Sequence, residues 1–103
     1  MALAHCVFIG LDPGHDPAEL SRVLDGLAAL QPHIDGFLHF LGGPNVDLEQ
    51  MSPEFDAGFV ITFRDRAALA RYAVDPRHKA LGARLKGQCR AGGIKVFDIE
   101  TPA

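Results

Sequence analysis

The sequence lacks the features that mark nucleic-acid-binding and membrane-spanning proteins. Its ten lysines and arginines are scattered and the net charge is −3, so there is no basic cluster to bind nucleic acid. No window approaches the ~20 consecutive apolar residues that a membrane-spanning helix needs. The apolar N-terminus has no basic region, and Asp12-Pro13-Gly14 ends it too early for a signal peptide. These absences favour a cytoplasmic protein.

Cysteine and histidine are too dispersed to predict a metal site. Cys6 and Cys89 are far apart and match no metal-ligand spacing. A disulfide between them stays open, but two reduced, half-buried thiols are the favoured interpretation for a cytoplasmic protein. The five histidines fall on separate predicted elements, and no two stand four residues apart on one helix. We therefore expect no metal site, and nothing in the sequence predicts a bound cofactor.

The 103 residues predict one domain, residues 1–103, with its core over 4–99. Apolar periodicity and turn residues predict the element order β-α-β-β-α-β. The strands are expected over 4–11, 37–43, 58–63 and 94–99, one helix over 17–31, and a two-part helix that begins at 66 and restarts at Pro76. This order is typical of the α+β, ferredoxin-like fold, with a four-stranded antiparallel sheet and both helices on one face.

Helix boundaries are marked by Asp and Pro. Asp16 and Asp65 suit N-caps, and Glu19 stands where a capping box would place it. Pro76 disfavours helical geometry at the residue before it, so the first part of the two-part helix should end near Asp75. Asp75 then caps the second part, with proline at its first position.

Two polar side chains flank this helix break, Tyr72 before it and His78 after it. The positive end of the helix dipole disfavours a charged imidazole in the first turn, so His78 should be biased toward its neutral form. Neutral histidine is the form that a general base needs. His78 also shares a helical face with Leu81 and Leu85, which directs it toward the interior. The alternative interpretation is that Tyr72 and His78 are structural residues that fill the edge of the core.

The first three predicted strands carry apolar residues on both faces, and His5, Val7 and Ile9 share one face of the first. Helices can cover one face only, and a large exposed apolar face is expected to be an interaction surface. We therefore predict a homodimer through the sheet face, with a barrel-like core. The aperiodic stretch between the second and third strands is long for a small domain, which is typical of a binding lid.

Several segments can be compared together with known families: HCVF at 5–8, GGPN at 42–45, GFVITF at 58–63, RDRAAL at 64–69, DPRH at 75–78 and VFD at 96–98, together with Tyr72. In their order and spacing they resemble the stress-response A/B barrel (Dabb) family of dimeric α/β barrels. The resemblance covers roughly residues 4 to 99. It implies a homodimer of ferredoxin-like subunits, each with a pocket between sheet and helices. Most members have no assigned activity.

The family includes olivetolic acid cyclase of plants, which closes a polyketide by aldol condensation without a cofactor. The resemblance matches its pocket residues to His5, Tyr72 and His78, with His78 as the base and Tyr72 in support. The implied pocket would be lined by Val7, Ile9, Val23, Leu24, Leu27, Leu81 and Leu85. This chain departs from the cyclase, because helix one offers aliphatic residues where the cyclase has bulky aromatics, and Gly10 stands where lysine is frequent.

Three functions stay open. The first is binding of a small apolar molecule by a domain of unassigned activity. The second is cofactor-free cyclase chemistry, in which His78 removes a proton next to a carbonyl, Tyr72 orients it and His5 holds the substrate oxygen. The third is a cofactor-free monooxygenase or a haem-handling protein, since related barrels include both.

Overall fold

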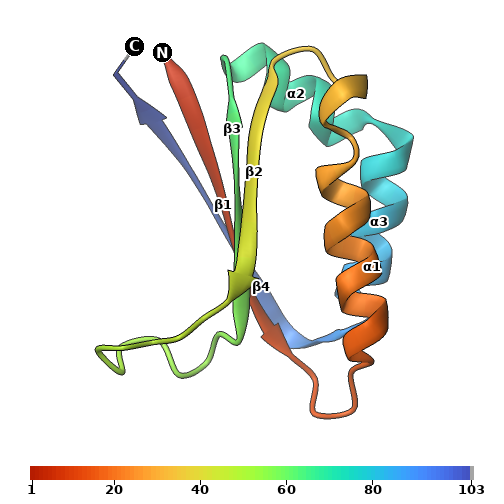
Figure 1. The fold of residues 1–103 in the computed structure, drawn as a ribbon, viewed down its shortest axis with the longest axis vertical. Coiled ribbons are helices and arrows are strands. Elements are labelled where there is room, and N and C mark those ends of the chain that lie inside the picture. Colours follow the sequence, from red (N-terminus) through yellow and green to blue (C-terminus); the bar gives the residue numbers. More distant parts are fainter. Residues whose placement is uncertain (103) are drawn as a thin grey trace.

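The structure is a computed structural model that describes residues 1–102, and it contains a four-stranded antiparallel sheet covered by helices on one face (Figure 1). The strands are β1 (Ala2–Leu11), β2 (Phe37–Pro44), β3 (Ala57–Phe63) and β4 (Cys89–Thr101). Their spatial order is β2-β3-β1-β4. The helices are α1 (Pro17–Ala28), the short 3-10 helix η1 (Gln31–His33), α2 (Arg66–Val74) and α3 (Pro76–Lys86). The prediction of a ferredoxin-like fold is confirmed.

The helices begin where their capping aspartates stand. The side chain of Asp16 accepts from the Ala18 amide, and that of Asp65 accepts from the Ala68 amide. Asp75 lies between α2 and α3, and its carboxylate accepts from the Arg77 amide. A backbone N–H at the first position of a helix has no partner within that helix. Pro76, which lacks this N–H, therefore costs α3 little stability.

Some predicted details differ. Glu19 forms no capping box, because its carboxylate accepts from the Arg84 guanidinium at 2.8 and 2.9 Å and so ties α1 to α3. The first helix ends at Ala28 rather than near 31, since Pro32 lies in the separate turn η1. The last strand begins at Cys89, five residues earlier than predicted. Gly92 adopts a positive φ of 69° within it, which lets the strand continue through the Gly-Gly pair.

The core lies between the sheet and the helices. Burial alternates perfectly along β3, where every second residue from Ala57 to Phe63 is buried. Fifteen apolar residues form the buried cluster: Leu3, Val7, Ile9, Val23, Leu27, Leu30, Ile34, Phe37, Ala57, Phe59, Ile61, Phe63, Ala68, Tyr72 and Leu85. Within residues 1–102, no helix is long and apolar enough to cross a membrane.

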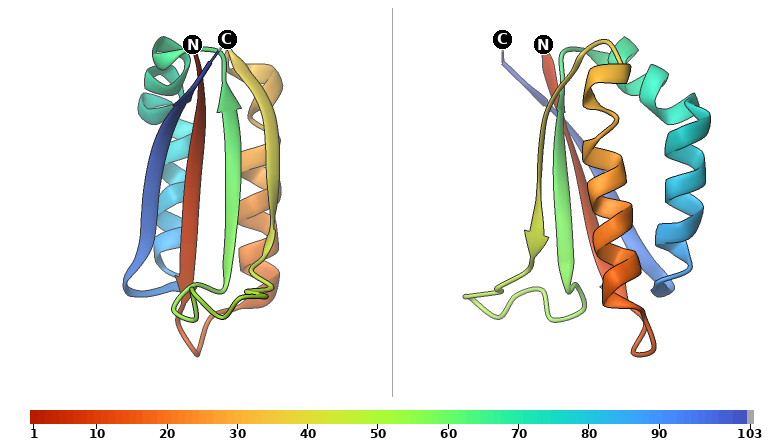
Figure 2. Two further views of the ribbon diagram at one scale, coloured as in Figure 1. Left: turned by 90° about the vertical axis from the view of Figure 1, so that its left-hand side faces the viewer. Right: turned by 45° about the vertical axis from the view of Figure 1, so that its right-hand side comes forward.

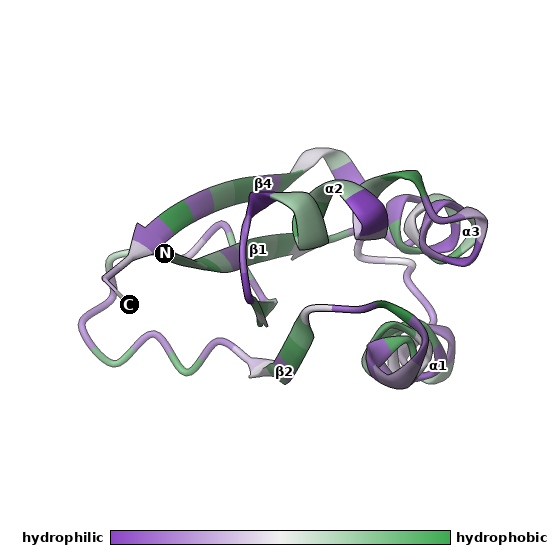
Figure 3. Cartoon of the chain, turned by 90° about the horizontal axis from the view of Figure 1, so that it is seen from above, coloured by the Kyte–Doolittle hydropathy of each residue, from purple (hydrophilic) through white to green (hydrophobic). Residues whose placement is uncertain are grey.

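Among the residues that the structure describes, no helix covers the opposite face of the sheet, as the two views of Figure 2 show. We call it the open face. Cross-strand register places Cys6 beside Val60 and Phe97 on this face, and Phe8 between Gly58 and Lys95. Hydrophobic and hydrophilic residues are interspersed along β4 in Figure 3: Ile94 packs against the core on the helix side, whereas Phe97 and Ile99 lie on the open face. Phe97 and Ile99 are each 54% exposed, which leaves an apolar surface uncovered.

Candidate functional site

Tyr72 and His78 meet across the break between α2 and α3. The break turns the chain so that the last turn of α2 and the first turn of α3 lie together. The centroids of the two rings are 4.0 Å apart and the rings are inclined by 36°. Tyr72 is 1% exposed, whereas His78 is half-buried. His78 Nδ1 lies 3.3 Å from the carbonyl oxygen of Ala73, one turn earlier in the chain.

His5 reaches the same cluster from the middle of β1. Its ring packs against Tyr72 with the centroids 5.7 Å apart, and against Phe63 and Phe59 at 6.0 and 6.5 Å. Its Nδ1 lies 2.6 Å from Oδ1 of Asp98, the residue directly opposite it on β4. The structure thus brings together the three predicted site residues and adds a carboxylate to them.

Burial controls the ionisation of the cluster. Removal of His78 from water is the largest effect and lowers the pKa of its imidazole; the bond to the Ala73 carbonyl raises this pKa by less, and the nearby His5 lowers it again by a smaller amount. Burial also raises the pKa of the Tyr72 hydroxyl well above its usual range. At neutral pH the cluster therefore holds a neutral His78 and a protonated phenol.

This protonation pattern defines what the cluster can do chemically. If His78 Nδ1–H donates to the Ala73 carbonyl, Nε2 carries the free lone pair and can accept a proton. A protonated phenol can donate a hydrogen bond but cannot act as a base at neutral pH. His5 is oriented by Asp98, in the way that a carboxylate commonly fixes the tautomer of a histidine. One base, one donor and one oriented imidazole thus lie close together.

A small hollow of about 350 Å³ adjoins this cluster at Asp98. It lies between α2 and the edge of the sheet and is lined by Leu3, Arg66, Leu69, Asp98 and Glu100. Arg66 and Glu100 form a bidentate ion pair across it, with N–O distances of 2.7 and 3.0 Å. The hollow therefore gives solvent access to the Asp98 end of the cluster.

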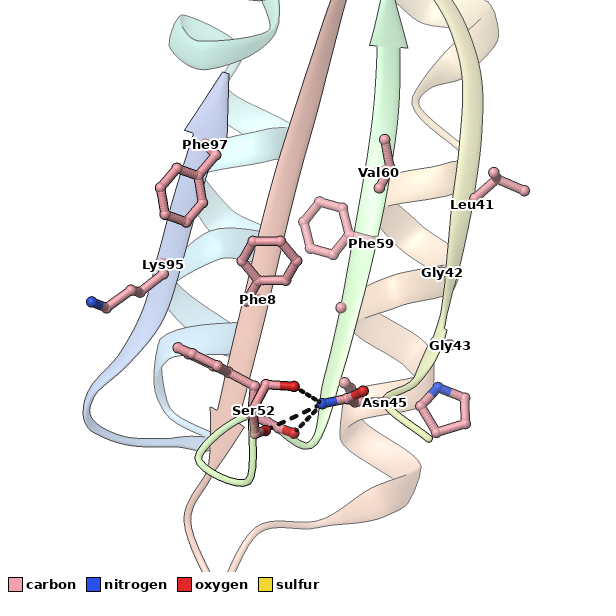
Figure 4. A pocket seen from close by; sticks show the side chains of 14 residues that line it. Phe8, Leu41, Gly42, Gly43, Asn45, Ser52, Phe59, Val60, Lys95 and Phe97 are labelled. Atoms are coloured by element: carbon pink, nitrogen blue, oxygen red, sulfur yellow. Dashed lines mark hydrogen bonds between the residues drawn. The ribbon is translucent and has the colours of Figure 1, made fainter. Parts of the chain in front are cut away.

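The apolar residues predicted to line a pocket lie in or against the core. Val7, Ile9, Val23, Leu27 and Leu85 belong to the buried cluster, and Leu24 and Leu81 pack against it. Their place beside a bound molecule stays a prediction. The largest hollow described, about 770 Å³, is on the open face instead (Figure 4), between the sheet and the loop that joins β2 to β3. That loop, predicted to be a binding lid, therefore lies on the open-face side of the sheet and does not cover His78.

Asp98 is the site residue that sequence reasoning missed. The sequence does contain a signal, since Asp98 is the one acidic residue inside the apolar stretch from 94 to 99. Its partner became visible only with the register of β1 and β4, which joins residues 93 positions apart. His39 lies exposed on β2. Within residues 1–102, no three His, Cys, Asp or Glu side chains gather where they could hold a metal ion.

Comparison with known proteins places the chain among domains of one kind. The sequence model of the stress responsive A/B barrel domain matches residues 3–101. A dimeric ferredoxin-like protein of unknown function from Jannaschia sp. CCS1 is 37% identical, with a TM-score of 0.85 over 98% of this chain and 100% of that chain. A comparison with curated protein sequences found no significant match.

Two structures of known activity share the fold at low identity. A hydroxynitrile lyase from Passiflora edulis is 14% identical, with a TM-score of 0.82 over 95% of this chain and 91% of that chain. The cofactor-independent oxygenase SnoaB from Streptomyces nogalater is also 14% identical, with a TM-score of 0.78 over 99% of this chain and 94% of that chain. At this identity the likeness concerns the fold alone.

Proposed function

The chain belongs to the stress-responsive A/B barrel domain family, and from this premise we propose that it binds a small apolar molecule carrying a carbonyl group at the His5–Tyr72–His78 cluster. The molecule would lie between the sheet and α2 and α3, close to Asp98. Apolar residues of the core would contact its hydrocarbon part, and the cluster would contact its oxygen. Mostly apolar walls with a few convergent polar groups are typical of small-molecule sites.

One observation carries this proposal: a half-buried neutral imidazole packs against a fully buried phenol, with the ring centroids 4.0 Å apart and the rings inclined by 36°. Burial disfavours the protonated form of this imidazole and lowers its pKa, so the ring is held there in its neutral form. His5, whose ring packs against the same phenol ring, adds a second polar pair with Asp98. Such groups are placed well to orient a carbonyl compound.

Cofactor-free proton transfer is the second candidate, favoured by the bond that His78 Nδ1 makes to the Ala73 carbonyl. His78 Nε2 would take a proton from the carbon next to a carbonyl group. The C–H electron pair would move to the carbonyl oxygen, which the Tyr72 hydroxyl would stabilise by donating a hydrogen bond. The resulting enolate could attack a second carbonyl in the same molecule, which is an aldol ring closure. A general base of this kind contributes typically ~10²–10⁴-fold to the rate.

A panel of linear β-polyketones separates the two candidates. Wild type, His78→Gln and Tyr72→Phe would each be followed by thermal shift and by chromatography of the recovered compounds. Binding alone predicts a raised melting temperature with compounds recovered unchanged, and a smaller shift in both variants. Proton transfer predicts cyclised product, reduced ~10²–10⁴-fold in His78→Gln. Equal thermal shifts for wild type and both variants across the panel would overturn the proposed site.

The chain would act as a cytoplasmic homodimer joined through the open face. Support comes from exposed apolar side chains on that face: Leu41 is 60% exposed and Phe97 54%. Uncovered apolar surface of this kind favours association. The relative from Jannaschia, at 37% identity, is described as dimeric. Sedimentation velocity at micromolar concentration tests this directly, since a single species of 11.1 kDa would contradict it.

A further inference from the structure

The loop that joins β2 to β3 extends away from the helices and past the open face (Figures 1 and 2). Its tip, which we define as residues 45–52, exposes three large apolar side chains. Val46 is 72% exposed, Leu48 88% and Met51 78%. A single exposed apolar residue is common, but three together on one projecting segment form an apolar patch whose exposure to water is unfavourable. Such a patch is expected to be a contact surface.

The tip is held in one shape by its own hydrogen bonds. The Asn45 side-chain amide donates to the Ser52 and Phe55 carbonyls and to the Ser52 hydroxyl, at 3.3, 3.0 and 2.9 Å. Asp47 Oδ1 accepts from the Met51 and Ser52 amides at 2.9 and 3.1 Å. Asp47 itself adopts a positive φ of 42°. A loop that is already ordered pays little further conformational entropy when it binds, so its shape suits a docking element.

The base of the loop is fastened to the sheet and to β4. The Asp56 amide donates to the Ile9 carbonyl at 2.8 Å, and the Asp56 carboxylate accepts from the Leu11 amide at 2.7 Å. Arg90 donates to the Glu54 carbonyl at 2.7 Å and lies 6.0 Å from the centre of the Phe55 ring. The tip is therefore presented by a rigid base.

Beside this base lies the open-face hollow of about 770 Å³ (Figure 4). Its walls are mainly aromatic and aliphatic: the Phe8 ring lies 5.8 Å from Phe97 and 6.0 Å from Phe55, and Leu41 and Val60 complete it. Within residues 1–102, Lys95 is the only charged residue that lines it. The same chain thus carries a projecting apolar tip and a concave apolar surface.

We infer that the tip of each β2–β3 loop packs into the open-face hollow of a second copy of the chain, so that the two loops clasp the dimer. A two-fold axis forms the contact twice, since each subunit offers both a tip and a hollow. The inference rests on the open-face homodimer proposed above and adds the segment that secures it. The contact is continuous with that interface, because the hollow is part of the open face.

The charge of the tip favours a second copy of the chain, rather than a lipid surface, as its binding partner. The tip contains Asp47 and Glu49 and no lysine or arginine. Two carboxylates beside Leu48 oppose approach to anionic lipid headgroups, which attract basic segments. In the hollow of a second copy, the same carboxylates would come near Lys95, an arrangement of complementary charge.

The test compares Leu48→Ser with Val74→Ser by sedimentation equilibrium. Val74 is a matched control, because it is also a large exposed aliphatic residue, at 66%, but lies at the end of α2. Leu48→Ser should raise the dimer dissociation constant about a hundredfold or more, since each dimer loses two buried leucines. Val74→Ser should leave the constant within about twofold of wild type, as expected of a substitution away from the contact.

The outcomes separate the clasp from the dimer itself. A monomeric wild type would overturn both the open-face dimer and the clasp. A dimeric wild type with an unchanged constant in Leu48→Ser would overturn the clasp alone. Binding of wild type to phosphatidylcholine vesicles that Leu48→Ser loses, with dimerisation unchanged, would show that the tip contacts lipid instead and would also overturn the clasp.

Peroxide oxidation of Met51 gives a second measurement without any substitution in the tip. The clasp predicts that Met51 is oxidised severalfold more slowly than free methionine added to the same sample when the chain is concentrated. On dilution below the dissociation constant its rate should rise toward that of the added methionine, because the side chain is 78% exposed in one subunit. A rate that does not depend on protein concentration would contradict the clasp.

Discussion

Replacement of Tyr72 tests whether the centre of the candidate site is also part of the core. Its ring is 1% exposed and contacts four other rings. The centroid distances are 4.0 Å to His78, 5.2 Å to Phe63, 5.7 Å to His5 and 5.9 Å to Phe37. Tyr72→Ala removes all four contacts and leaves a cavity, whereas Tyr72→Phe keeps the ring and removes only the hydroxyl.

The expected magnitudes differ enough to be measured. Removal of a large buried aromatic side chain costs about 3–5 kcal/mol of unfolding free energy. Aromatic pairs contribute about 0.5–1.5 kcal/mol beyond their buried area, which places Tyr72→Ala toward the upper end. This is a large part of the roughly 5–15 kcal/mol that stabilises a typical domain. Tyr72→Phe should cost about 1 kcal/mol or less, because it keeps the packed ring and removes only one hydroxyl group.

Urea unfolding at fixed protein concentration gives the free energies, and proton NMR gives the titration of His78. In Tyr72→Ala, water reaches the imidazole, so the pKa of His78 should rise back toward its ordinary value of 6.5. In Tyr72→Phe the pKa should stay lowered, because the ring still shields the imidazole. A Tyr72→Ala cost below about 1 kcal/mol, or an unchanged His78 pKa, would refute the packing argument.

Three further predictions concern pH and local structure. Burial lowers the folded-state pKa of His78 below 6.5, so the unfolded chain takes up the proton first; the stabilisation that neutral His78 provides should be complete above about pH 6.5 and be lost as pH falls toward the folded pKa. His78→Gln should remove this part of the pH slope in urea unfolding between about pH 5 and 7.5. Asp65→Ala removes the side chain that accepts from the Ala68 amide at 2.9 Å, and should lower the free energy of unfolding by about 1 kcal/mol in the same assay. Asp65→Asn should keep most of the wild-type stability, because asparagine is also a good N-cap. Gly36→Ala should destabilise by about 1–3 kcal/mol, since Gly36 has a φ of 88° and a Cβ there would lie 2.5 Å from that of Ala68. Gly82→Ala is its control: a Cβ there meets nothing within 4 Å in the middle of α3, so a gain of about 0.5–1 kcal/mol is expected, and a loss would contradict the model of a free helix face.

Local chemistry made the secondary structure predictable. The helix break at Asp75-Pro76 depends on the restricted φ of proline and on a carboxylate one residue earlier, both of which act within a few residues. Strand β3 was equally readable, since its period of two puts alternate residues into the core. Once the elements and their order were known, few compact arrangements remained, and the ferredoxin-like sheet was one of them.

Contacts between distant residues were not readable in the same way. Glu19 stands where a capping box would use it, but the fold places Arg84 beside it and the ion pair forms instead. The loop after β2 has no periodicity from which its shape could be predicted, because that shape depends on hydrogen bonds of Asn45 and Asp47 within the loop. The base of the loop is held by a distant contact, that of the Asp56 amide with the Ile9 carbonyl.

The same distinction between local and distant contacts applies to the candidate site. The sequence by itself determined that Tyr72 and His78 flank a helix break and that a buried imidazole there would be neutral, because the proline, the cap and the helix dipole all act locally. The family resemblance implied that His5 joins them, and only the tertiary structure decided how its ring packs there and that Asp98 orients it. Those contacts depend on the register of β1 with β4, and register is set by how whole strands pack their apolar sides into the core rather than by any neighbouring residue.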